Sequence, residues 1–426
     1  MFEGRIIMED MKKKGERISI ALIGFGKMGQ SLASQIIHMG HIWPRVIVDH
    51  SPNKVKEALL AFAIQEELIF LTEDFYEAES FLASKKDGIV VTAKEDMGAK
   101  IEEIACVVDA TGSPFSGARI AYDAIENEKH IVMLNVECDS VVGPYLYQKA
   151  LEKGVIYTGS KGDEPAAIIE LLEFAANAGL EVVVAGKGKN NPLDFSKTPS
   201  SLKEEAEKKG LAPKMLTSFV DGTNTMAELC IVSNATGYLA PKEGFQGITA
   251  GPNEIADHYK EAKGPFLDFA FGMAPGVYVI VTSFDPERRK LLSYLGLGQG
   301  PMYTLYRPYH LTSLETPMSI VEAVVEHKAS ICPMHGQVSD VIAIAKRDLK
   351  EGEYLSGIGD KDCYGILIDH KEQKLGHYVP IALLNDKVKV IRDIPRGSRL
   401  RYEDIYFEEE SFLLSLRRLQ DQEEER

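Results

Sequence analysis

The chain has 426 residues, which at about 150 residues per domain predicts two or three domains. Hydrophobic residues make up 45% and charged residues 26%, proportions typical of a globular protein and not of a disordered one. The 48 Lys and Arg residues against 64 Asp and Glu give a formal net charge of −16, which repels nucleic-acid phosphates and anionic lipid, so we expect neither as a partner.

Cysteine usage and hydropathy indicate a cytoplasmic protein. The cysteines are scattered, odd in number and without a CxxC pair, a pattern typical of reduced thiols and not of a disulfide framework or a zinc cluster. They are Cys106, Cys138, Cys230, Cys332 and Cys363. No uncharged apolar run approaches the ~18 residues of a membrane span, so none is expected.

The first 160 residues alternate short apolar, β-rich runs with segments of helical spacing. The runs expected to form strands are Ile18–Gly24, Arg45–Val48, Leu68–Leu71, Ile89–Thr92, Ile104–Ala110 and His130–Leu134. Strands that alternate with helices predict right-handed βαβ units and a parallel sheet. We therefore expect an α/β fold whose N-terminal domain, residues 1–160, is a Rossmann-type, doubly wound parallel sheet.

The rest of the chain has a different pattern of predicted helices and strands. After residue 165 longer helices mix with strands, and the charged stretch Lys197–Gly210 is expected to be a solvated helix face. An α+β domain for substrate binding and oligomerisation is predicted over residues 161–335. In the tail, Arg347–Leu355 recurs as Arg392–Leu400 with an offset of 45 residues. This repeat predicts a small β domain over residues 336–410, made of two strand-turn-strand units, before a charged tail at residues 411–426.

A glycine motif follows the first expected strand and precedes a helical segment. Gly24 permits a tight turn, Gly26 lets the backbone approach a pyrophosphate, and Gly29 permits close helix–strand packing. The free N–H groups at the helix start, next to Lys27 and Met28, favour the phosphates of a dinucleotide.

Asp49, 20 residues after Gly29, ends the next strand and is placed to accept hydrogen bonds from a ribose 2′-hydroxyl, which favours NAD. His50, Ser51 and Lys54 follow closely and keep NADP open. The alternatives are a flavin or S-adenosylmethionine site, or a glycine turn without a ligand in which Asp49 caps a helix.

Two later strand ends extend the expected cofactor site. Thr111 and Gly112 are predicted to line the nicotinamide ribose, with an ordinary βα turn as the alternative. Asn135 is predicted to hold the nicotinamide or the substrate, and Glu137 to reach the substrate cleft; the alternative is a plain polar strand end.

Four motifs together resemble the homoserine-dehydrogenase-like oxidoreductases: GFGKMG (24–29), DATG (109–112), NVECD (135–139) and KGDEP (161–165). KGDEP, DGT (221–223), YRPYHL (306–311) and the tail repeat are similar to the subgroup that ends in a SAF domain, a small β-clip fold, and includes 1-deoxy-D-xylulose-5-phosphate reductoisomerase-like enzymes. The chain is also similar to oxidoisomerases of branched sugar acids such as apionate. Val136 stands where homoserine dehydrogenases usually have lysine, which disfavours a homoserine substrate.

Three lysines beside glycines are candidate catalytic groups, namely Lys161, Lys187 and Lys189. A partly buried lysine has a lowered pKa and can move a proton. Lys187 and Lys189 follow a β-rich run, so strand alternation predicts that both point to the same side, where two cations would hold an anion and stabilise an oxyanion. The alternative is a solvated turn.

Several acidic residues are further candidates. Asp163 and Glu164 either cap the helix that begins at Pro165 or serve as catalytic groups that bind substrate hydroxyls. Asp221, seven residues before Glu228, is predicted to bind substrate or to cap a helix. Hard cations such as Mg²⁺ or Mn²⁺ take carboxylate ligands, and Glu137 and Asp139 are the candidates for such a site, together with the Asp163–Glu164 pair.

Arg307 and His310 in YRPYHL either clamp an anionic substrate or belong to a packed aromatic loop.

The residues and the resemblance together predict an NAD- or NADP-dependent oxidoreductase that acts on CH–OH or C=O groups. The expected substrate is a small polyhydroxylated anion, with reductoisomerisation of a phosphosugar first, oxidation of a sugar acid second and homoserine oxidation third. A non-catalytic protein that senses a dinucleotide is the alternative from another class. A homodimer or homotetramer is expected.

Overall fold

The computed structural model describes residues 9, 11, 13–240 and 247–423. The chain forms two compact units, and each is discontinuous in sequence. The first contains residues 1–163, 311–332 and 415–426, and the second contains residues 164–310 and 333–414. None of the described helices combines the length and the apolar character needed to cross a bilayer.

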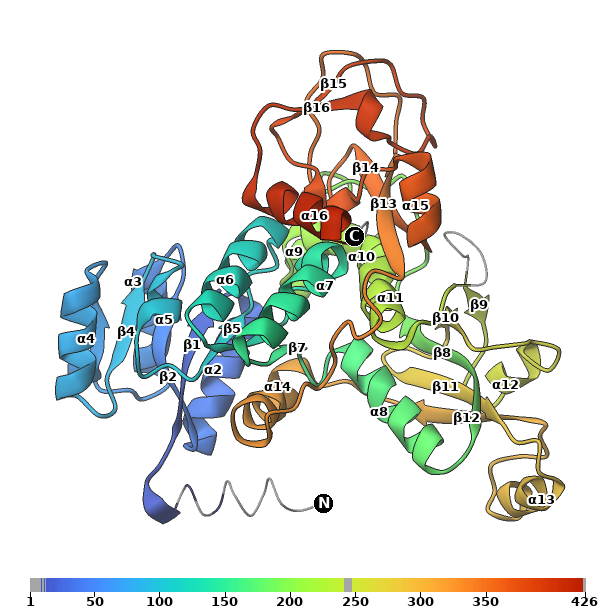
Figure 1. Ribbon diagram of the computed structural model, residues 1–426, viewed down its shortest axis with the longest axis horizontal. Coiled ribbons are helices and arrows are strands. Elements are labelled where there is room, and N and C mark those ends of the chain that lie inside the picture. Colours follow the sequence, from blue (N-terminus) through green and yellow to red (C-terminus); the bar gives the residue numbers. More distant parts are fainter. Residues whose placement is uncertain (1–8, 10, 12, 241–246, 424–426) are drawn as a thin grey trace. The chain divides into compact units, whose positions relative to one another are not determined.

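A parallel sheet of seven strands forms the centre of the first unit, in the order β3-β4-β2-β1-β5-β6-β7 (Figure 1). The strands are β1 (Ile18–Ile23), β2 (Ile42–Val48), β3 (Ile69–Leu71), β4 (Ile89–Thr92), β5 (Cys106–Asp109), β6 (His130–Met133) and β7 (Tyr157–Gly159). The strand order reverses at β1, whose neighbours are β2 and β5, and ligands of doubly wound sheets bind at this switch point. The predicted doubly wound sheet is confirmed.

Helices cover both faces of this sheet. They are α2 (Lys27–Met39), α3 (Pro52–Ala61), α4 (Phe75–Ser84), α5 (Met97–Lys100), α6 (Pro114–Glu126), α7 (Val136–Lys153), α14 (Thr312–Val321) and α16 (Phe412–Glu423). Apolar residues of α2, α3 and α14 pack on one face, and α5, α6 and α7 lie on the other (Figure 1). A short π-helix (Glu322–Glu326) continues α14.

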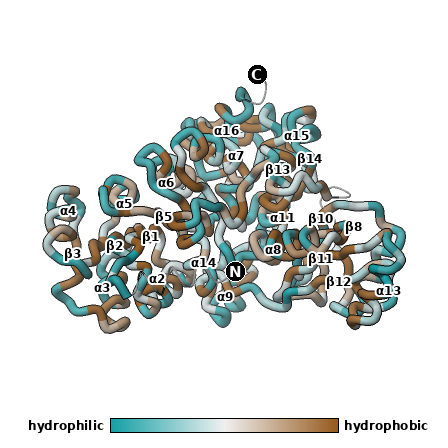
Figure 2. The backbone as a smooth tube through the Cα atoms, turned by 60° about the horizontal axis from the view of Figure 1, so that its bottom comes forward, coloured by the Kyte–Doolittle hydropathy of each residue, from teal (hydrophilic) through white to brown (hydrophobic). Residues whose placement is uncertain are grey.

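A five-stranded mixed sheet in the order β12-β11-β8-β10-β9 forms the centre of the second unit. The strands are β8 (Glu181–Lys189), β9 (Ile248–Thr249), β10 (Phe266–Phe271), β11 (Val277–Thr282) and β12 (Met302–Arg307). The helices of this part are α8 (Glu164–Asn177), α9 (Lys203–Lys209), α10 (Pro213–Val220), α11 (Thr223–Thr236), α12 (Ile255–His258) and α13 (Pro286–Tyr294). The central strand β11 is largely brown in Figure 2, in keeping with its buried apolar side chains.

The helix α11 is buried almost all round, and between Thr223 and Ala235 only Asn224 is partly exposed. A surface helix would have one apolar stripe, so burial on every side requires partners on every side. Here α8 and α10 are two of the partners and the C-terminal strands β13 (Ser339–Ala345) and β14 (Cys363–Asp369) are two more. The sequence predicted this helix.

The tail repeat folds as two halves that pair with each other. Asp348 Oδ1 accepts a hydrogen bond from Arg396 N at 2.8 Å, and Asp393 Oδ1 accepts one from Glu351 N at 3.0 Å. Asp393 is the counterpart of Asp348 in the second copy, and Arg396 is the counterpart of Glu351. The two bonds are therefore equivalent contacts, made once in each direction between the copies. The remaining elements here are α15 (His370–Gly376) and the antiparallel strands β15 (Val388–Val390) and β16 (Ile405–Phe407). The two copies therefore make equivalent contacts with each other, while residues 333–414 belong to the second unit and a separate β domain stays a prediction.

Two expected boundaries differ from the structure. Residues 311–332, expected in the substrate domain, belong to the first unit, because Ile320 and Val321 of α14 join the apolar core around β1. The predicted charged tail at 411–426 contains the helix α16, whose Arg417 side chain is fully buried and donates to Val141 O on α7 at 3.3 Å. A charged sequence conceals these packed positions, since arginine seldom occurs in a core unless it is paired.

Candidate active site

The glycine motif forms a close contact between the first strand and the first helix. Gly24 has a φ of 91°, and a Cβ there would lie 2.7 Å from the backbone carbonyl carbon of Ala110. A Cβ on Gly29 would lie 2.0 Å from Gly24 O, so only glycine allows α2 to begin this close to β1. Both spacing roles predicted from the motif are confirmed.

The space beside Gly26 is open. No heavy atom lies within 4 Å of a Cβ added at Gly26, and α2 begins with no side-chain cap on its N–H groups. Uncapped N–H groups and the helix dipole bind anions, so this corner fits the pyrophosphate of a dinucleotide. Lys27 and Met28 are exposed here, and Met28 O accepts a hydrogen bond from Ser313 Oγ of α14 at 3.3 Å.

Asp49 lies at the end of β2 and holds the glycine loop. Its Oδ2 accepts a hydrogen bond from Phe25 N at 2.9 Å and its Oδ1 accepts one from Ser51 N at 2.9 Å. The carboxylate is half-buried, so its remaining lone pairs are available to a ribose hydroxyl. Binding of the ribose stays a prediction, and a role in shaping the loop is added to it.

A buried network of hydrogen bonds orders the chain where β5 and β6 end. Asp109 accepts hydrogen bonds from Thr111 N at 2.9 Å and from Asn135 Nδ2 at 3.0 Å. Asn135 also donates to Ser113 O at 2.8 Å and caps α7 by accepting from Cys138 N at 3.1 Å. Both amide hydrogens of Asn135 are thus donated inside the fold, and Asn135 orders the loop that carries Thr111 and Gly112. Burial raises the pKa of Asp109 to about 6.

Glu137 and Asp139, the expected metal ligands, lie in the first turn of α7. Burial raises the pKa of Glu137 to about 7 and that of Asp139 to about 6, although Asp139 accepts a hydrogen bond from Tyr157 Oη at 2.8 Å. They form no cluster with a third carboxylate, histidine or cysteine of the described residues in which all ligand atoms lie within 4.8 Å of one another. Binding of Mg²⁺ or Mn²⁺ by Glu137 and Asp139 stays a prediction.

Lys161 is engaged in an ion pair within the first unit. Its Nζ lies 2.5 Å from Glu322 Oε1 on the π-helix, and Ser330 Oγ donates to the other carboxylate oxygen at 2.6 Å. Its backbone N–H donates to Ser319 Oγ at 2.8 Å. These contacts tie the chain after β7 to the segment around α14. Asp163 is the last residue of the first segment of this unit.

Lys187 is the centre of a buried charge cluster in the second unit. Its ammonium lies 2.9 Å from Glu164 Oε1 and also contacts Glu228 Oε2 of α11. Burial lowers the pKa of Lys187, but the two carboxylates outweigh it and the net pKa is raised, so Lys187 stays charged. Burial and the like charge of Glu164 raise the pKa of Glu228 to about 8, while Asn224 Nδ2 donates to Glu228 Oε1 at 2.8 Å.

Lys189 lies on the same side of β8 as Lys187, as strand alternation predicted. Its Nζ donates to Phe219 O at 2.5 Å, and its side chain is buried. Burial and the positive charge of Lys187 lower the pKa of Lys189 to about 8. A lysine with this pKa has a substantial neutral fraction near neutral pH and can accept a proton.

His310 and Arg307 extend the cluster toward the surface. His310 Nε2 lies 3.5 Å from Glu164 Oε1, with its side chain 23% exposed. Arg307 pairs with Glu170 of α8 at 2.7 Å and stacks over Tyr309 at 5.0 Å. The chain His310–Glu164–Lys187–Glu228 therefore runs from a partly exposed imidazole to a buried carboxylate. Sequence reasoning singled out Lys187, Lys189 and Glu164 for chemistry and noted Glu228 only for its spacing from Asp221.

Asp221, predicted to be catalytic or capping, is fully buried. Its Oδ1 accepts a hydrogen bond from Thr223 N at 3.0 Å, and its Oδ2 lies 2.8 Å from Lys346 Nζ. Sequence reasoning missed Lys346, which directly follows β13.

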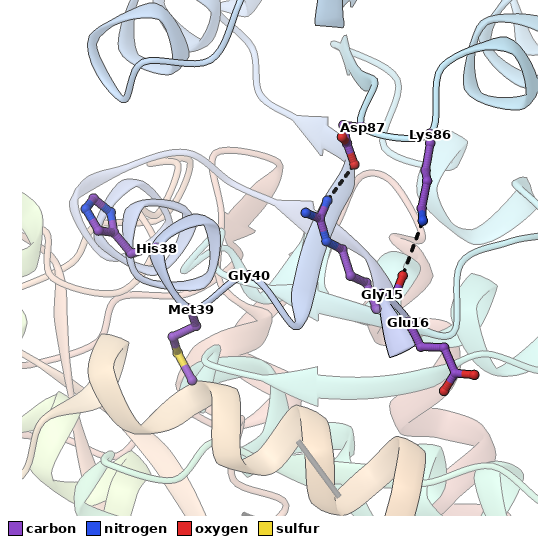
Figure 3. A pocket seen from close by; sticks show the side chains of 8 residues that line it. Gly15, Glu16, His38, Met39, Gly40, Lys86 and Asp87 are labelled. Carbon is purple, nitrogen blue, oxygen red and sulfur yellow. Dashed lines mark hydrogen bonds and ion pairs between the residues drawn. The ribbon is translucent and has the colours of Figure 1, made fainter. Parts of the chain in front are cut away.

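A pocket of about 320 Å³ opens elsewhere in the first unit (Figure 3). Arg17, His38, Lys86 and Asp87 line it, with Arg17 paired to Asp87 at 2.6 Å. These residues lie at or near the amino ends of β1, β2 and β4, whereas the glycine loop follows the carboxyl end of β1. The pocket is therefore separate from the dinucleotide corner.

Residues 162–316 match a protein-family model described as "Oxidoreductase DRL, catalytic domain". This segment holds Lys187, Lys189, Glu164 and Glu228. No curated protein matches the sequence.

Solved structures similar to the chain include a DOX-P reductoisomerase in complex with magnesium, at 14% identity and a TM-score of 0.41 over 72% of this chain and 68% of that one. GenD2 from gentamicin A biosynthesis in complex with NAD is similar at 13% identity and a TM-score of 0.38, over 74% and 88%. The putative oxidoreductase yvaA from Bacillus subtilis is similar at 11% identity and a TM-score of 0.39, over 76% and 93%. At this level the similarities say what the chain resembles and nothing further.

The family model and the dinucleotide corner of the first unit agree on the class of protein. The corner has the glycine spacing, the uncapped helix start and the acidic strand end of a nicotinamide-dinucleotide site. Residues 162–316 therefore match an oxidoreductase catalytic domain, and the corner of the first unit fits a dinucleotide.

Two alanine substitutions separate cofactor binding from folding. Gly26→Ala adds a methyl group to open space, so we expect an unchanged melting temperature but NADH binding weakened at least tenfold. Gly29→Ala places the methyl group against Gly24 O and should lower the melting temperature even without cofactor. Thermal unfolding and NADH fluorescence titration measure both effects. A Gly26→Ala variant that binds NADH as the wild type does would contradict the assigned corner.

Asp49 is expected to repel a 2′-phosphate. Asp49→Asn keeps one acceptor oxygen, enough for one of the two N–H groups of Phe25 and Ser51, and removes the charge, so the preference for NADH over NADPH should fall roughly tenfold, equivalent to about 1.4 kcal/mol. Dissociation constants for the two nucleotides measure this ratio. Asp49→Ala, which also releases the loop, should weaken the binding of both. An unchanged ratio in Asp49→Asn would remove Asp49 from ribose recognition.

Proposed function

We propose that the protein is an NAD(P)-dependent oxidoreductase of the reductoisomerase kind, acting on a small polyhydroxylated anion that resembles 1-deoxy-D-xylulose 5-phosphate. The observation that carries this proposal is the buried cluster of Lys187, Lys189, Glu164 and Glu228 inside the segment that matches an oxidoreductase catalytic domain.

The cluster supplies the proton chemistry that carbonyl reduction needs. The nicotinamide provides the hydride, and the carbonyl oxygen takes up one proton for each hydride delivered to its carbon. Lys189, with a pKa lowered to about 8, gives that proton in reduction and takes it back in oxidation. Lys187 keeps a fixed positive charge beside Lys189 and holds its pKa down.

The same residues support the proposed substrate class. Glu164 and Glu228 offer carboxylate oxygens to the hydroxyl groups of a polyol. Lys189 and Arg307 provide positive charge for a phosphate or carboxylate. Because Glu164 and Glu228 already neutralise Lys187, this lysine is not a free cation for the anion, contrary to the role predicted for it from the sequence.

The test is a panel of phosphosugars and aldonates with NADH and NADPH, each with and without Mg²⁺ or Mn²⁺. Turnover of a phosphorylated keto-sugar with rearrangement supports the proposal, whereas oxidation of an aldonate favours the sugar-acid oxidoisomerase. Tight nucleotide binding without any turnover favours a dinucleotide sensor. A dependence on the added ion would identify a metal requirement.

Removing either lysine should abolish most of the activity. We expect Lys187→Met and Lys189→Met to lower kcat by about 100-fold or more, the usual cost of losing a charge-stabilising or proton-transferring group, with NADH affinity unchanged. Lys290→Met, which removes an exposed lysine of α13 paired only to Glu287 among the contacts described, is the matched control and should retain full activity. Rates like those of the wild type in both active-site variants would exclude the cluster from catalysis.

The pH dependence follows from the lowered pKa of Lys189. In the direction of alcohol oxidation Lys189 must be neutral to accept the proton, so kcat should rise as the pH passes through about 8 and level off above it. Glu228, whose pKa is raised to about 8, titrates in the same range, and Glu228→Gln separates the two. A rising limb that persists in Glu228→Gln and disappears in Lys189→Met is the expected result. A rising limb that disappears in Glu228→Gln instead would identify Glu228 as the proton acceptor.

A further inference from the structure

The C-terminal hairpin of β13 and β14 holds α11 along its length. At the start of the helix, Thr223 Oγ1 accepts a hydrogen bond from Gly365 N of β14 at 2.8 Å. Near its end, Ser233 Oγ and Ser339 Oγ are 2.7 Å apart, and Asn234 Oδ1 accepts from Ser339 N at 3.1 Å. The helix that carries Glu228 is therefore fixed by a part of the chain more than a hundred residues away in the sequence.

Lys346 is the charged contact of this arrangement. It directly follows β13, and its ammonium lies 2.8 Å from Asp221 Oδ2, with side-chain exposures of 2% and 0%. It also donates hydrogen bonds to Lys197 O at 2.9 Å and to Asp360 O at 2.6 Å. A buried lysine with two hydrogen-bond acceptors and an ion-pair partner holds one position.

Asp221 connects Lys346 to the lysine cluster. It ends α10 two residues after Phe219, whose carbonyl oxygen accepts the hydrogen bond from Lys189. The charged groups that act on Lys189 are Lys187 on its own strand, Glu228 of α11 and Asp221. The negative charge of Asp221 raises the pKa of Lys189, and Lys346 is the ion-pair partner of Asp221.

We propose that Lys346 is a positioning residue through which the C-terminal β domain sets the protonation of Lys189: by neutralising Asp221 it keeps Lys189 ready to exchange a proton. Lys346 itself touches neither Lys187 nor Lys189 in the described contacts, so it acts through Asp221. This inference rests on the proposed function of Lys189 and gives the small C-terminal domain a part in it.

The sign of the effect separates this role from simple structural support. Removing Lys346 leaves the carboxylate of Asp221 without its counter-ion, which should raise the pKa of Lys189. Removing the charge of Asp221 leaves the Lys346 cation instead, which should lower it. A pair that only stabilises the fold would give two destabilised variants with no opposite shifts.

The test compares Lys346→Met and Asp221→Asn in the full-length chain. The rate at which acetic anhydride modifies Lys189 is measured against pH by peptide mass spectrometry, which gives a titration midpoint without any substrate. We expect the midpoint to rise by about half a pH unit or more in Lys346→Met and to fall by a similar amount in Asp221→Asn. The double variant should return it close to the wild-type value.

Arg347→Met is the matched control. Arg347 is the next residue and pairs with Asp362 and Glu353, both at 2.7 Å and both in the C-terminal domain. We expect this variant to melt at a lower temperature with the Lys189 midpoint unchanged. If Lys346→Met fails to fold, the near-isosteric Asp221→Asn still has to lower the midpoint. Absent shifts, or shifts of the same sign in both variants, would overturn the proposal.

The labelling result and the substrate panel fail independently. Opposite shifts in a protein that turns over no sugar would keep the electrostatic link and overturn the proposed reaction. Turnover of a sugar without these shifts would keep the reaction and remove Lys346 from it.

Discussion

The ammonium of Lys187 between the carboxylates of Glu164 and Glu228 is the interaction on which the second unit depends. Removing one partner of a buried ion pair costs about 3–5 kcal/mol, because the remaining charge is left without a counter-ion. The start of α8, the end of β8 and the second turn of α11 must therefore meet at one point. Once they meet, the positions of Lys189 on the same strand and of Asn224 on the same helix follow from the geometry of the elements.

In the first unit, strand periodicity and glycine spacing were sufficient to predict the fold and the cofactor corner. Apolar runs predicted β1 to β6 to within three residues at each end, because strands of a parallel sheet are buried on both faces and read as continuous apolar stretches. Gly24 and Gly29 were recognisable because their roles are steric: a Cβ on Gly29 would meet Gly24 O, and a Cβ on Gly24 would meet the backbone of Ala110. The second role of Asp49 was not predicted, since nothing in the spacing indicates that its carboxylate also accepts from Phe25 N.

The candidate catalytic cluster was predictable only in part. Alternation along β8 placed Lys187 and Lys189 on one side, which is a local property of a strand. Their partners Glu164, Glu228 and Phe219 lie 23 to 41 residues away, and pairings at that distance have no periodic signal in the sequence. Lys346 has a weak signal: it precedes the first copy of the tail repeat, where the second copy has Ile391, so the repeat itself marks the position as different. A lysine in place of an apolar residue within a duplicated unit points to a contact that only one copy makes.

The charges of the cluster explain why the C-terminal domain contributes to it. Lys187 is held charged by two carboxylates, and its charge in turn lowers the pKa of Lys189. An unpaired carboxylate at Asp221 would counteract that lowering, since its charge raises the pKa of Lys189, whereas an apolar residue there would lose the hydrogen bond that Asp221 accepts from Thr223 N at the start of α11. A carboxylate paired with a cation from outside the cluster keeps the hydrogen bond and weakens the effect of its charge on Lys189. Lys346 delivers that counter-charge from a separate hairpin, so the lysine cluster depends on residues that need not touch the substrate.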